Sequence, residues 1–479
     1  MDPASPGPAS GVSSSEPGPP DGTRLVVPAP VNELLEILWA AGQAAWVVGG
    51  SLRDAFLGLP AVDWDLATDA RPDRLLEIFP RAVYENQFGT VAVRHAGDLY
   101  QITTFRTDHD YADHRRPHRV EFGDSVEEDL RRRDFTVNAM AWGSPAPRAG
   151  APAPSAGARA IPSLVDPFDG RADVERRLLR AVGDPAVRFE EDALRMVRAV
   201  RLAATLTFEI EPATLAAIAS RADLVAHLSG ERIGAELGKL LAAPRPSIGL
   251  RLMADTGILG RISPELAAQR GVAQNKVAGE DLWDHTLRAV DAAPAERPVV
   301  RLAALVHDIG KPATAADGHF YGHDRIGADL ARELLERLRY PRAATDRVVA
   351  LVRQHMFDYE ESWTDPAVRR FIGKVGRDAL DELFELRAAD NLGSGVPADG
   401  TGLAELRRRV DEQLVADAAV ERADLAIDGD DLISELGLKR GPTIGRLLAE
   451  LLDRVVADPA LNDRPTLLLV ARTLVEDER

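Results

Sequence analysis

Residues 49–69 read GGSLRDAFLGLPAVDWDLATD, and this stretch decides the fold of the first part of the chain. The apolar run AAWVVGG (44–50) predicts a strand, and residues 51–57 predict a helix that ends at Gly58. A second strand is predicted over 63–68. Because glycine lets the backbone approach a ligand closely, the Gly49-Gly50 pair between strand and helix is a candidate binding turn.

Two carboxylates in the same stretch predict a metal site. Asp63 and Asp65 are two positions apart on the predicted strand, so both side chains point to one face. Their charges repel each other unless a cation lies between them. Hard oxygen ligands with this spacing suit Mg²⁺ bound to substrate phosphates. The alternative is a solvated strand edge.

A cluster of basic residues follows in RRRDFTVNA (131–139). One interpretation places Arg133 near a triphosphate and Asp134 near a sugar hydroxyl. The other is a basic patch at the end of a helix.

The segment EEDALRMVRAVRLAA (190–204) places four charged residues three positions apart, which on a helix keeps them on one face: Asp192, Arg195, Arg198 and Arg201. An aspartate accepts from an exocyclic amino group, and an arginine donates to a ring nitrogen. Cytosine and adenine present that amino group beside a ring acceptor, whereas uracil and guanine present the reverse. An Asp–Arg pair would therefore admit C and A and reject U and G.

The remaining patterns divide the chain into an α/β part and an all-α part. We expect a small mixed sheet with helices over 24–172, interrupted by a Pro/Ala/Gly-rich mobile insertion at 144–162. Residues 1–23 have a disordered composition. Helical periodicity then continues almost throughout, with predicted boundaries that give a neck (173–275), a body (276–400) and a tail (401–479).

The motifs GGSLRD, DWD, RRRDFTVNAM, DPFDGRAD and EDALRMVRAVR, in that order, resemble bacterial class II CCA-adding enzymes, the tRNA nucleotidyltransferases. The resemblance is close over about 24–275 and looser beyond. It implies a nucleotidyltransferase head on a helical neck, body and tail, and template-independent addition of C, C and A to the 3′ end of tRNA from CTP and ATP. The tail would contact tRNA.

The same resemblance implies roles for individual residues. Asp63 and Asp65 would hold Mg²⁺ for an attack of the tRNA 3′-hydroxyl on the α-phosphate. Asp192 and Arg195 would act as the amino-acid template for C or A. The other implied nucleotide contacts are Gly50, Arg53, Arg133, Arg198 and Arg201.

One position departs from the family. Many relatives carry a carboxylate where Gln101 stands, so a third carboxylate, if needed, must come from elsewhere or be dispensable. The stretch 107–122 lies where the family has a flexible loop used in switching from C to A.

Spaced histidines and aspartates in 285–390 resemble the HD metal-dependent phosphohydrolases. The resemblance implies four ligands of a first divalent metal, whose identity stays open: His285, His307, Asp308 and Asp390. His323 and His355 could serve a second metal, and Lys311 a phosphate. Phosphatase, 2′-nucleotidase or 2′,3′-cyclic phosphodiesterase activity is implied. The alternative is a structural relic in the tRNA-binding half.

Composition and charge limit the kinds of site and the compartment that the sequence allows. The 479 residues include no cysteine, which excludes disulfides and thiolate sites, and the net charge is −18. No apolar run reaches the roughly 20 residues that span a bilayer, so we expect a cytoplasmic protein without membrane contact. The rival functions are a poly(A) polymerase, a partial CC- or A-adding enzyme, an HD phosphohydrolase with an inactive head, and a non-catalytic RNA-binding protein. The oligomeric state is not predicted.

Overall fold

The computed structural model describes residues 25–61, 63–86, 89–109, 119–146, 161–274, 276–316, 319–400, 402–415 and 425–477. The N-terminal segment 1–23, the central part of the insertion 144–162 and residues 110–118 of the predicted loop lie outside the described residues. The chain divides into two compact units. The first holds the described residues up to 109 together with 119–176, and the second holds those from 177 onward.

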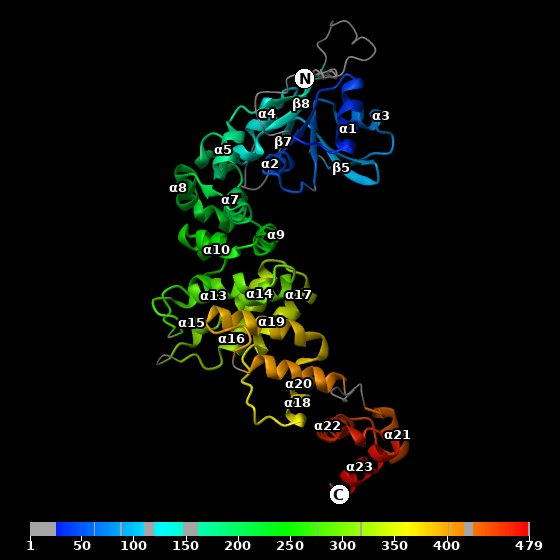
Figure 1. The fold of residues 1–479 in the computed structure, drawn as a ribbon. Helices are drawn as coiled ribbons and strands as arrows, with labels where there is room; N and C mark the ends of the chain where they lie inside the picture. The colour runs from blue at the N-terminus through cyan, green and yellow to red at the C-terminus, as the bar shows by residue number, and fades with distance from the viewer. Residues whose placement is uncertain are drawn as a thin grey trace, which may run out of the picture. The chain divides into compact units, whose positions relative to one another are not determined.

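The first unit is built on a seven-stranded sheet in the order β3-β4-β5-β2-β1-β8-β9 (Figure 1). Strands β2 and β5 pair in parallel, whereas the other neighbours pair antiparallel. The strands are β1 (Ala45–Val48), β2 (Asp65–Thr68), β3 (Val83–Asn86), β4 (Thr90–His95), β5 (Asp98–Thr104), β8 (Ala141–Ser144) and β9 (Ser163–Val165). A separate hairpin pairs β6 (Arg106–His109) with β7 (Arg119–Phe122). The helices are α1 (Ala29–Ala40), α2 (Gly50–Phe56), α3 (Pro72–Ile78), α4 (Val126–Arg131), η1 (Thr136–Asn138) and α5 (Gly170–Arg176).

Local sequence explains the centre and the turns of this sheet. All four residues of β1 are buried. Its two edges pair with β2 and β8, and its side chains are covered by packing that includes helices α1 and α2. Strands β4 and β5 are joined at Ala96 and Gly97, whose positive φ values of 50° and 97° are those of a tight hairpin turn. The insertion predicted at 144–162 does connect two paired strands, β8 and β9.

The second unit is almost entirely helical, as the periodicity predicts. Its elements up to residue 306 are β10 (Leu178–Leu179), α6 (Pro185–Glu191), α7 (Leu194–Leu206), β11 (Glu209–Ile210), α8 (Pro212–Arg221), η2 (Ala222–His227), α9 (Gly230–Leu241), α10 (Pro246–Asp255), α11 (Ile258–Ile262), α12 (Pro264–Ala267), α13 (Leu282–Ala292) and α14 (Pro298–Val306). The remaining elements are α15 (Lys311–Thr314), α16 (His323–Arg337), α17 (Arg342–Gln354), α18 (Asp365–Val375), η3 (Arg377–Ala379), α19 (Leu380–Gly393), α20 (Leu403–Val415), α21 (Gly429–Leu436), α22 (Pro442–Ala457), η5 (Pro459–Leu461) and α23 (Arg464–Asp477). The predicted α/β head and all-α remainder are confirmed.

Two predicted elements begin later than expected, and both changes concern site residues. Strand β2 begins at Asp65, so Asp63 precedes the strand. Helix α7 begins at Leu194, so Asp192 lies outside it, in extended backbone with φ −147° and ψ 103°. The interpretation of residues 190–204 as one continuous helix is therefore wrong. Asp192 ends α6 and accepts from the backbone N–H of Leu194, a contact that starts the new helix.

Candidate functional site

The glycine turn of the first unit lies against two predicted site residues. Gly49 ends β1 with a φ of +83°, which favours glycine. A Cβ built on Gly49 would lie 3.1 Å from Nη1 of Arg133 and 3.6 Å from Oδ2 of Asp65. A Cβ on Gly50 would lie 3.3 Å from Nη2 of Arg53. The structure therefore gathers Gly49, Gly50, Arg53, Asp65 and Arg133 around the end of β1.

Asp63 and Asp65 flank the buried Trp64 and are both exposed. The shared side that the sequence predicted is therefore kept, although only Asp65 belongs to the strand. Desolvation of its carboxyl group by the surrounding protein raises the pKa of Asp65. The Arg133 guanidinium partly opposes this increase, and the Asp63 carboxylate adds to it. A pair of neighbouring carboxylates in this state favours a cation.

Sequence reasoning missed two residues that hold the arginines of this cluster. Asp129 is buried and lies 2.7 Å from Nη2 of Arg132 and 3.3 Å from Nη2 of Arg133. Burial alone would raise the pKa of Asp129, but the two guanidinium groups lower it overall. The signal was present in EEDLRRRD, because Asp129 stands three and four positions before the two arginines.

Asn138 is the second missed residue. Its side-chain oxygen accepts from Nη1 of Arg53 at 2.6 Å, and its side-chain nitrogen donates to Asp134 at 3.1 Å. Asp134 also accepts from the backbone N–H of Phe135. One amide thus links two predicted nucleotide-binding residues that are far apart in the sequence.

Gln101 lies directly beside Asp65, since the two residues are partners in the parallel pairing of β2 with β5. Its side-chain nitrogen donates to Oε2 of Glu85 at 3.0 Å. An amide, which carries no negative charge, therefore stands next to the proposed metal-binding carboxylate.

The four residues of the predicted base template lie in the second unit, and each contacts a charged partner there. Asp192 accepts from Arg232 of α9 at 2.7 Å. Arg195 donates to Glu191 at 2.6 Å and to the carbonyl oxygen of Arg188 at 3.1 Å.

The buried Glu236 of α9 organises the other two arginines. Its Oε2 accepts from Nε of Arg201 at 2.6 Å, and its Oε1 lies 3.9 Å from Nη1 of Arg198. Helices α7 and α9 pack against each other, so α9 presents Arg232 and Glu236 to the template segment. Neither residue was singled out from the sequence.

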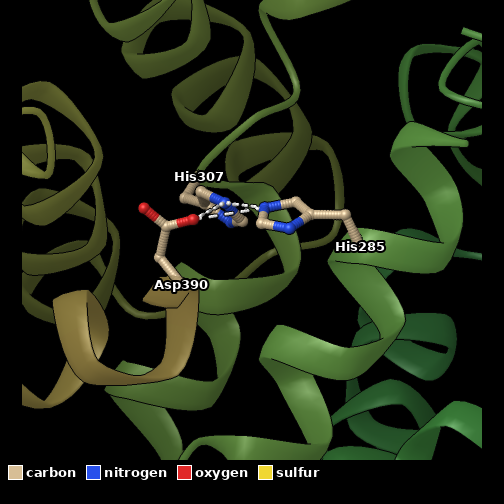
Figure 2. A group of neighbouring side chains, drawn as sticks. All are labelled: His285, His307 and Asp390. Carbon is tan, nitrogen blue, oxygen red and sulfur yellow. Dashed lines mark hydrogen bonds and ion pairs between the residues drawn. The ribbon is translucent and has the colours of Figure 1, made fainter. Parts of the chain in front are cut away.

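The histidines and aspartates of residues 285–390 converge from several helices of the second unit. His285 lies in α13, His307 and Asp308 follow α14, and Asp390 lies in α19. His323 begins α16, and His355 follows α17. All six side chains are buried. Figure 2 shows the His285 and His307 rings and the Asp390 carboxylate pointing toward one another.

Close helix packing explains this convergence. A Cβ on Gly393 of α19 would lie 3.0 Å from Cβ of Ala289 in α13, and a Cβ on Gly310 would lie 2.3 Å from the carbonyl oxygen of His323. Glycine at these two positions lets α19 approach α13 and lets the turn after α14 approach α16. Asp390 and His323 are thereby brought to the cluster.

The two oxygens of Asp308 face different histidines. Its Oδ2 lies 3.2 Å from Nε2 of both His285 and His307, whereas its Oδ1 lies 3.4 Å from Nε2 of His323 and 3.7 Å from Nε2 of His355. Ligand atoms able to hold a metal ion gather in two groups, His285 with His307 and Asp390, and Asp308 with His323 and His355. Asp308 was assigned to the first set by resemblance, and it lies between the two.

Backbone contacts turn the imidazoles toward this centre. Nδ1 of His307, His323 and His355 lies 2.7–2.8 Å from the carbonyl oxygen three residues earlier. If each Nδ1 donates there, each Nε2 is left as an acceptor for a metal. Nε2 of His323 and of His355 are buried and have no hydrogen-bond partner among the described residues.

The charges in this cluster are strongly coupled. Burial would lower the pKa of His307, but Asp308 and Asp390 raise it to about 9. Burial would raise the pKa values of Asp308 and Asp390, but the histidines and the neighbouring lysines hold both well below the usual range. The two carboxylates are therefore charged at neutral pH.

A pocket of 670 Å³ opens beside the cluster. Its lining includes Asp308, His323 and Asp390, together with the cations Lys311, Lys276 and Arg387. Nζ of Lys311 lies 2.6 Å from Asp308, and Nη1 of Arg387 lies 3.1 Å from Asp390. The sequence analysis found Lys311 but missed Lys276, which stands outside any motif, and Arg387, which stands three positions before Asp390.

Comparisons with known families place three domains along the chain. Residues 45–180 match the Poly A polymerase head domain, residues 207–270 the probable RNA and SrmB-binding site of polymerase A, and residues 275–394 the HD domain.

Whole-chain relatives decide the family. The CCA-adding enzyme of Streptococcus suis is 33% identical over 446 residues, which cover 93% of this chain and 96% of the relative. That of Geobacillus stearothermophilus is 33% identical over 433 residues, covering 90% and 93%.

The chain belongs to the CCA-adding enzyme family. Among solved structures, the Bacillus stearothermophilus CCA-adding enzyme in complex with CTP is 30% identical with a TM-score of 0.69, covering 94% of this chain and all of that one. The Thermotoga maritima CCA-adding enzyme complexed with tRNA shares the fold at 18% identity, with a TM-score of 0.55 and coverages of 94% and 96%. The resemblance inferred from the motifs is confirmed. Within the described residues, no helix has the length and apolar character required to cross a bilayer.

Proposed function

We propose that this chain adds C, C and A to the 3′ end of tRNA, using CTP and ATP and releasing pyrophosphate. The observation that carries the proposal is the 33% identity to CCA-adding enzymes over almost the whole chain. The cluster at the end of β1 supports it, because Arg53, Arg133 and Asp65 lie beside the Gly49-Gly50 turn. Because tRNA is the substrate, the expected compartment is the cytoplasm.

Asp63 and Asp65 are the residues that would hold Mg²⁺. The donor set fits the ion, because two neighbouring carboxylate oxygens are hard ligands and the Asp63 charge contributes to the raised pKa of Asp65. When bound, Mg²⁺ would neutralise charge that develops on the phosphates during transfer. Gln101 does not contribute a third carboxylate, so the pair acts without one on this strand.

The surrounding residues bind and orient the nucleotide. Arg133 and Arg53 would contact the triphosphate, and their fixed positions against Asp129 and Asn138 limit reorganisation when substrate binds. The close approach at Gly50 leaves room for a phosphate beside Arg53. Asp134 would contact the sugar.

Asp192 and Arg195 would select the base, and Arg198 and Arg201 would complete the site. The aspartate accepts from the exocyclic amino group of C or A while the arginine donates to the ring nitrogen. U and G would leave these groups unpaired, which is a strong ground for rejection.

The deciding experiment is extension of labelled tRNA that ends at the discriminator base, with Mg²⁺ and CTP, ATP, both, or UTP with GTP. We expect two additions with CTP, a stop at three with both nucleotides, and none with UTP and GTP. Asp65→Asn should abolish extension. The Asp192→Ala enzyme should extend tRNA without selecting C and A over U and G. A long ladder with ATP alone would identify a poly(A) polymerase, and a single added C or A a partial enzyme.

A second proposed function is hydrolysis of phosphoesters in the HD domain. It is favoured by a specific observation, the two buried ligand groups that share Asp308 at the edge of the pocket. The set fits divalent metals, because the inward Nε2 atoms of His323 and His355 have no hydrogen-bond partner among described residues. A metal held by His285, His307 and Asp390 would lower the pKa of a bound water. Lys311 would contact the phosphate.

Phosphohydrolase assays with Mg²⁺, Mn²⁺, Ni²⁺ and Co²⁺ test this second function. We expect hydrolysis of nucleoside 2′-phosphates or 2′,3′-cyclic phosphates with at least one metal, and loss of it in His307→Ala. Asp63→Ala should leave this activity intact while tRNA extension is lost. If none of these metals supports hydrolysis, the cluster is a structural core of the HD domain and not a catalytic site.

A further inference from the structure

The pocket beside the HD cluster has one wall that the metal and phosphate chemistry does not use. This wall is the loop segment 319–322, which precedes α16, and it contributes His319, Phe320 and Tyr321 to the pocket lining. Tyr321 is 82% exposed, whereas the metal-ligand candidates below it are buried. A large aromatic side chain in open solvent at a pocket mouth is available for a ligand.

Short-range contacts hold this loop in place. The backbones of Ala316 and His319 exchange two hydrogen bonds, of 3.0 and 2.9 Å. Nζ of Lys311 lies 5.6 Å from the centre of the Phe320 ring, and the carbonyl oxygen of Phe320 lies 2.7 Å from Nδ1 of His323. The loop is therefore tied to the phosphate lysine and to a metal-ligand candidate.

The rings of His319 and Tyr321 are stacked. Their centres are 5.3 Å apart, and their planes differ by 19°. Two nearly parallel flat rings on one wall of a pocket present a surface on which a third flat ring can stack. Stacking of bases on aromatic side chains is the usual way in which proteins hold an unpaired base.

Three cations also line the pocket, and one of them, Lys311, lies against the Phe320 ring. Nζ of Lys276 lies 3.7 Å from Asp390 Oδ1 and 2.9 Å from Ser394 Oγ, and Arg387 contacts the other oxygen of Asp390. With Lys311, three cations thus line the pocket close to the proposed metals. The pocket lining thus combines cations that can hold an anion with aromatic rings on which a flat ring can stack, and a nucleotide has both parts.

We propose that His319 and Tyr321 form a base-stacking platform, so that the HD pocket takes nucleotide phosphoesters in preference to phosphoesters without a base. This inference rests on the proposed HD phosphohydrolase function and assigns the residues that would recognise the base of its substrate. In the reaction, the oxygen of water bonds to phosphorus, the P–O bond to the ribose breaks, and the ribose oxygen leaves with a proton from that water. The platform takes no part in bond making or breaking, and it raises the affinity of the pocket for a substrate that carries a base.

The test compares two substrates in the full chain, adenosine 2′-phosphate and glycerol 2-phosphate, with the metal that gives the highest wild-type activity. Tyr321→Ala should raise KM for the nucleotide about tenfold, the scale of one lost base stack, and leave kinetics with glycerol phosphate unchanged. Tyr321→Phe keeps the ring and should behave like wild type. The matched control is Tyr84→Ala, which removes an exposed tyrosine of β3.

The outcomes separate the platform from the hydrolase. If Tyr321→Ala affects both substrates equally, or neither, the platform is overturned while the hydrolase stands. If wild-type protein hydrolyses neither substrate, the hydrolase proposal fails, and the platform is decided by calorimetric titration of adenosine 2′-phosphate into protein whose head site is weakened by Arg133→Ala. Weaker binding when Tyr321→Ala is added to this variant would then support the platform, and equal binding or no binding would overturn it.

Discussion

Asp308 presents one carboxylate oxygen to His285 and His307 and the other to His323 and His355. A carboxylate in this position can bridge two ions, and a neutral amide of the same shape cannot balance their charge. The side chain is buried and paired with Lys311, so its charge is compensated even before a metal binds.

At this residue we predict that Asp308→Asn lowers metal binding at both groups. The bound-metal content of purified protein, measured by elemental analysis, should fall from two equivalents toward none, and HD hydrolysis should be lost. Extension of tRNA should continue, because the head residues lie in the other unit. Asp329→Asn, an exposed change on α16, is the control. Retention of one full equivalent would contradict a shared ligand.

Gln101 offers a second prediction at a single residue. Gln101→Glu places a carboxylate beside Asp65 on the neighbouring strand, and the added negative charge should strengthen Mg²⁺ binding. The concentration of Mg²⁺ that gives half-maximal tRNA extension should therefore fall. Glu85→Gln controls for the altered contact with Glu85. An unchanged Mg²⁺ requirement would show that position 101 does not face the metal.

At the scale of elements, α9 holds the template segment through two ion pairs. Arg232 binds Asp192, and Glu236 binds Arg201, so α9 fixes the side chains that follow α6 and those of α7. Since Glu236 is buried, removing its charge leaves Arg198 and Arg201 without their shared partner.

We predict that Glu236→Gln raises KM for CTP and ATP together, by about tenfold or more, and leaves the choice of C and A over U and G intact. The reason is that Glu236 positions arginines that would contact phosphates and does not contact the base. The measurement is steady-state extension with each nucleotide. Glu231→Gln, which removes an exposed carboxylate from the first turn of the same helix, is the control. Misincorporation of U by Glu236→Gln would place this residue in base selection.

The sequence predicted elements well where periodicity and turn residues act locally. The hairpin at Ala96-Gly97 and the helical second unit follow from such patterns. The break before α7 was not predicted, because the three-residue spacing of the charged residues Asp192, Arg195 and Arg198 continues across it. What breaks the helix is a side-chain contact to the backbone of Leu194, and a spacing rule does not contain that contact.

At the scale of the whole molecule, the sequence motifs identified the family, and they predicted a nucleotidyltransferase head and an HD domain. They did not reveal the partners that arrive from distant segments. Asn138, Arg232 and Glu236 carry no motif, and their importance depends on packing that only the folded chain shows. The predicted domain limits at 172, 275 and 400 stay predictions, as do the roles of the site residues.

The HD cluster makes the stability of the whole chain depend on pH and metal. Without metal, His307 has a pKa raised to about 9 from 6.5, so its stabilising contribution is complete below about pH 6.5 and is lost as the pH rises through 9. Metal binding needs the neutral imidazole and therefore becomes tighter over the same interval.

We therefore predict that the increase in thermal unfolding midpoint on adding Mn²⁺ grows between about pH 6.5 and 9. Differential scanning calorimetry with chelator or with Mn²⁺ measures it. His307→Gln should remove most of the pH dependence. An equal increase at both ends of the interval would show that His307 binds no metal.

The ion pairs of the template segment have a consequence for fidelity. Nη2 of Arg232 donates to Oδ2 of Asp192, and Nη1 of Arg195 donates to Oε2 of Glu191. An incoming base thus competes with internal ligands of the protein. In the proposed role of Asp192 and Arg195, cytosine and adenine would replace both partners at once, whereas a base that satisfies only one residue would leave the ion pairs of the protein favoured. Wrong nucleotides would then be rejected by the cost of breaking these internal pairs without replacing both.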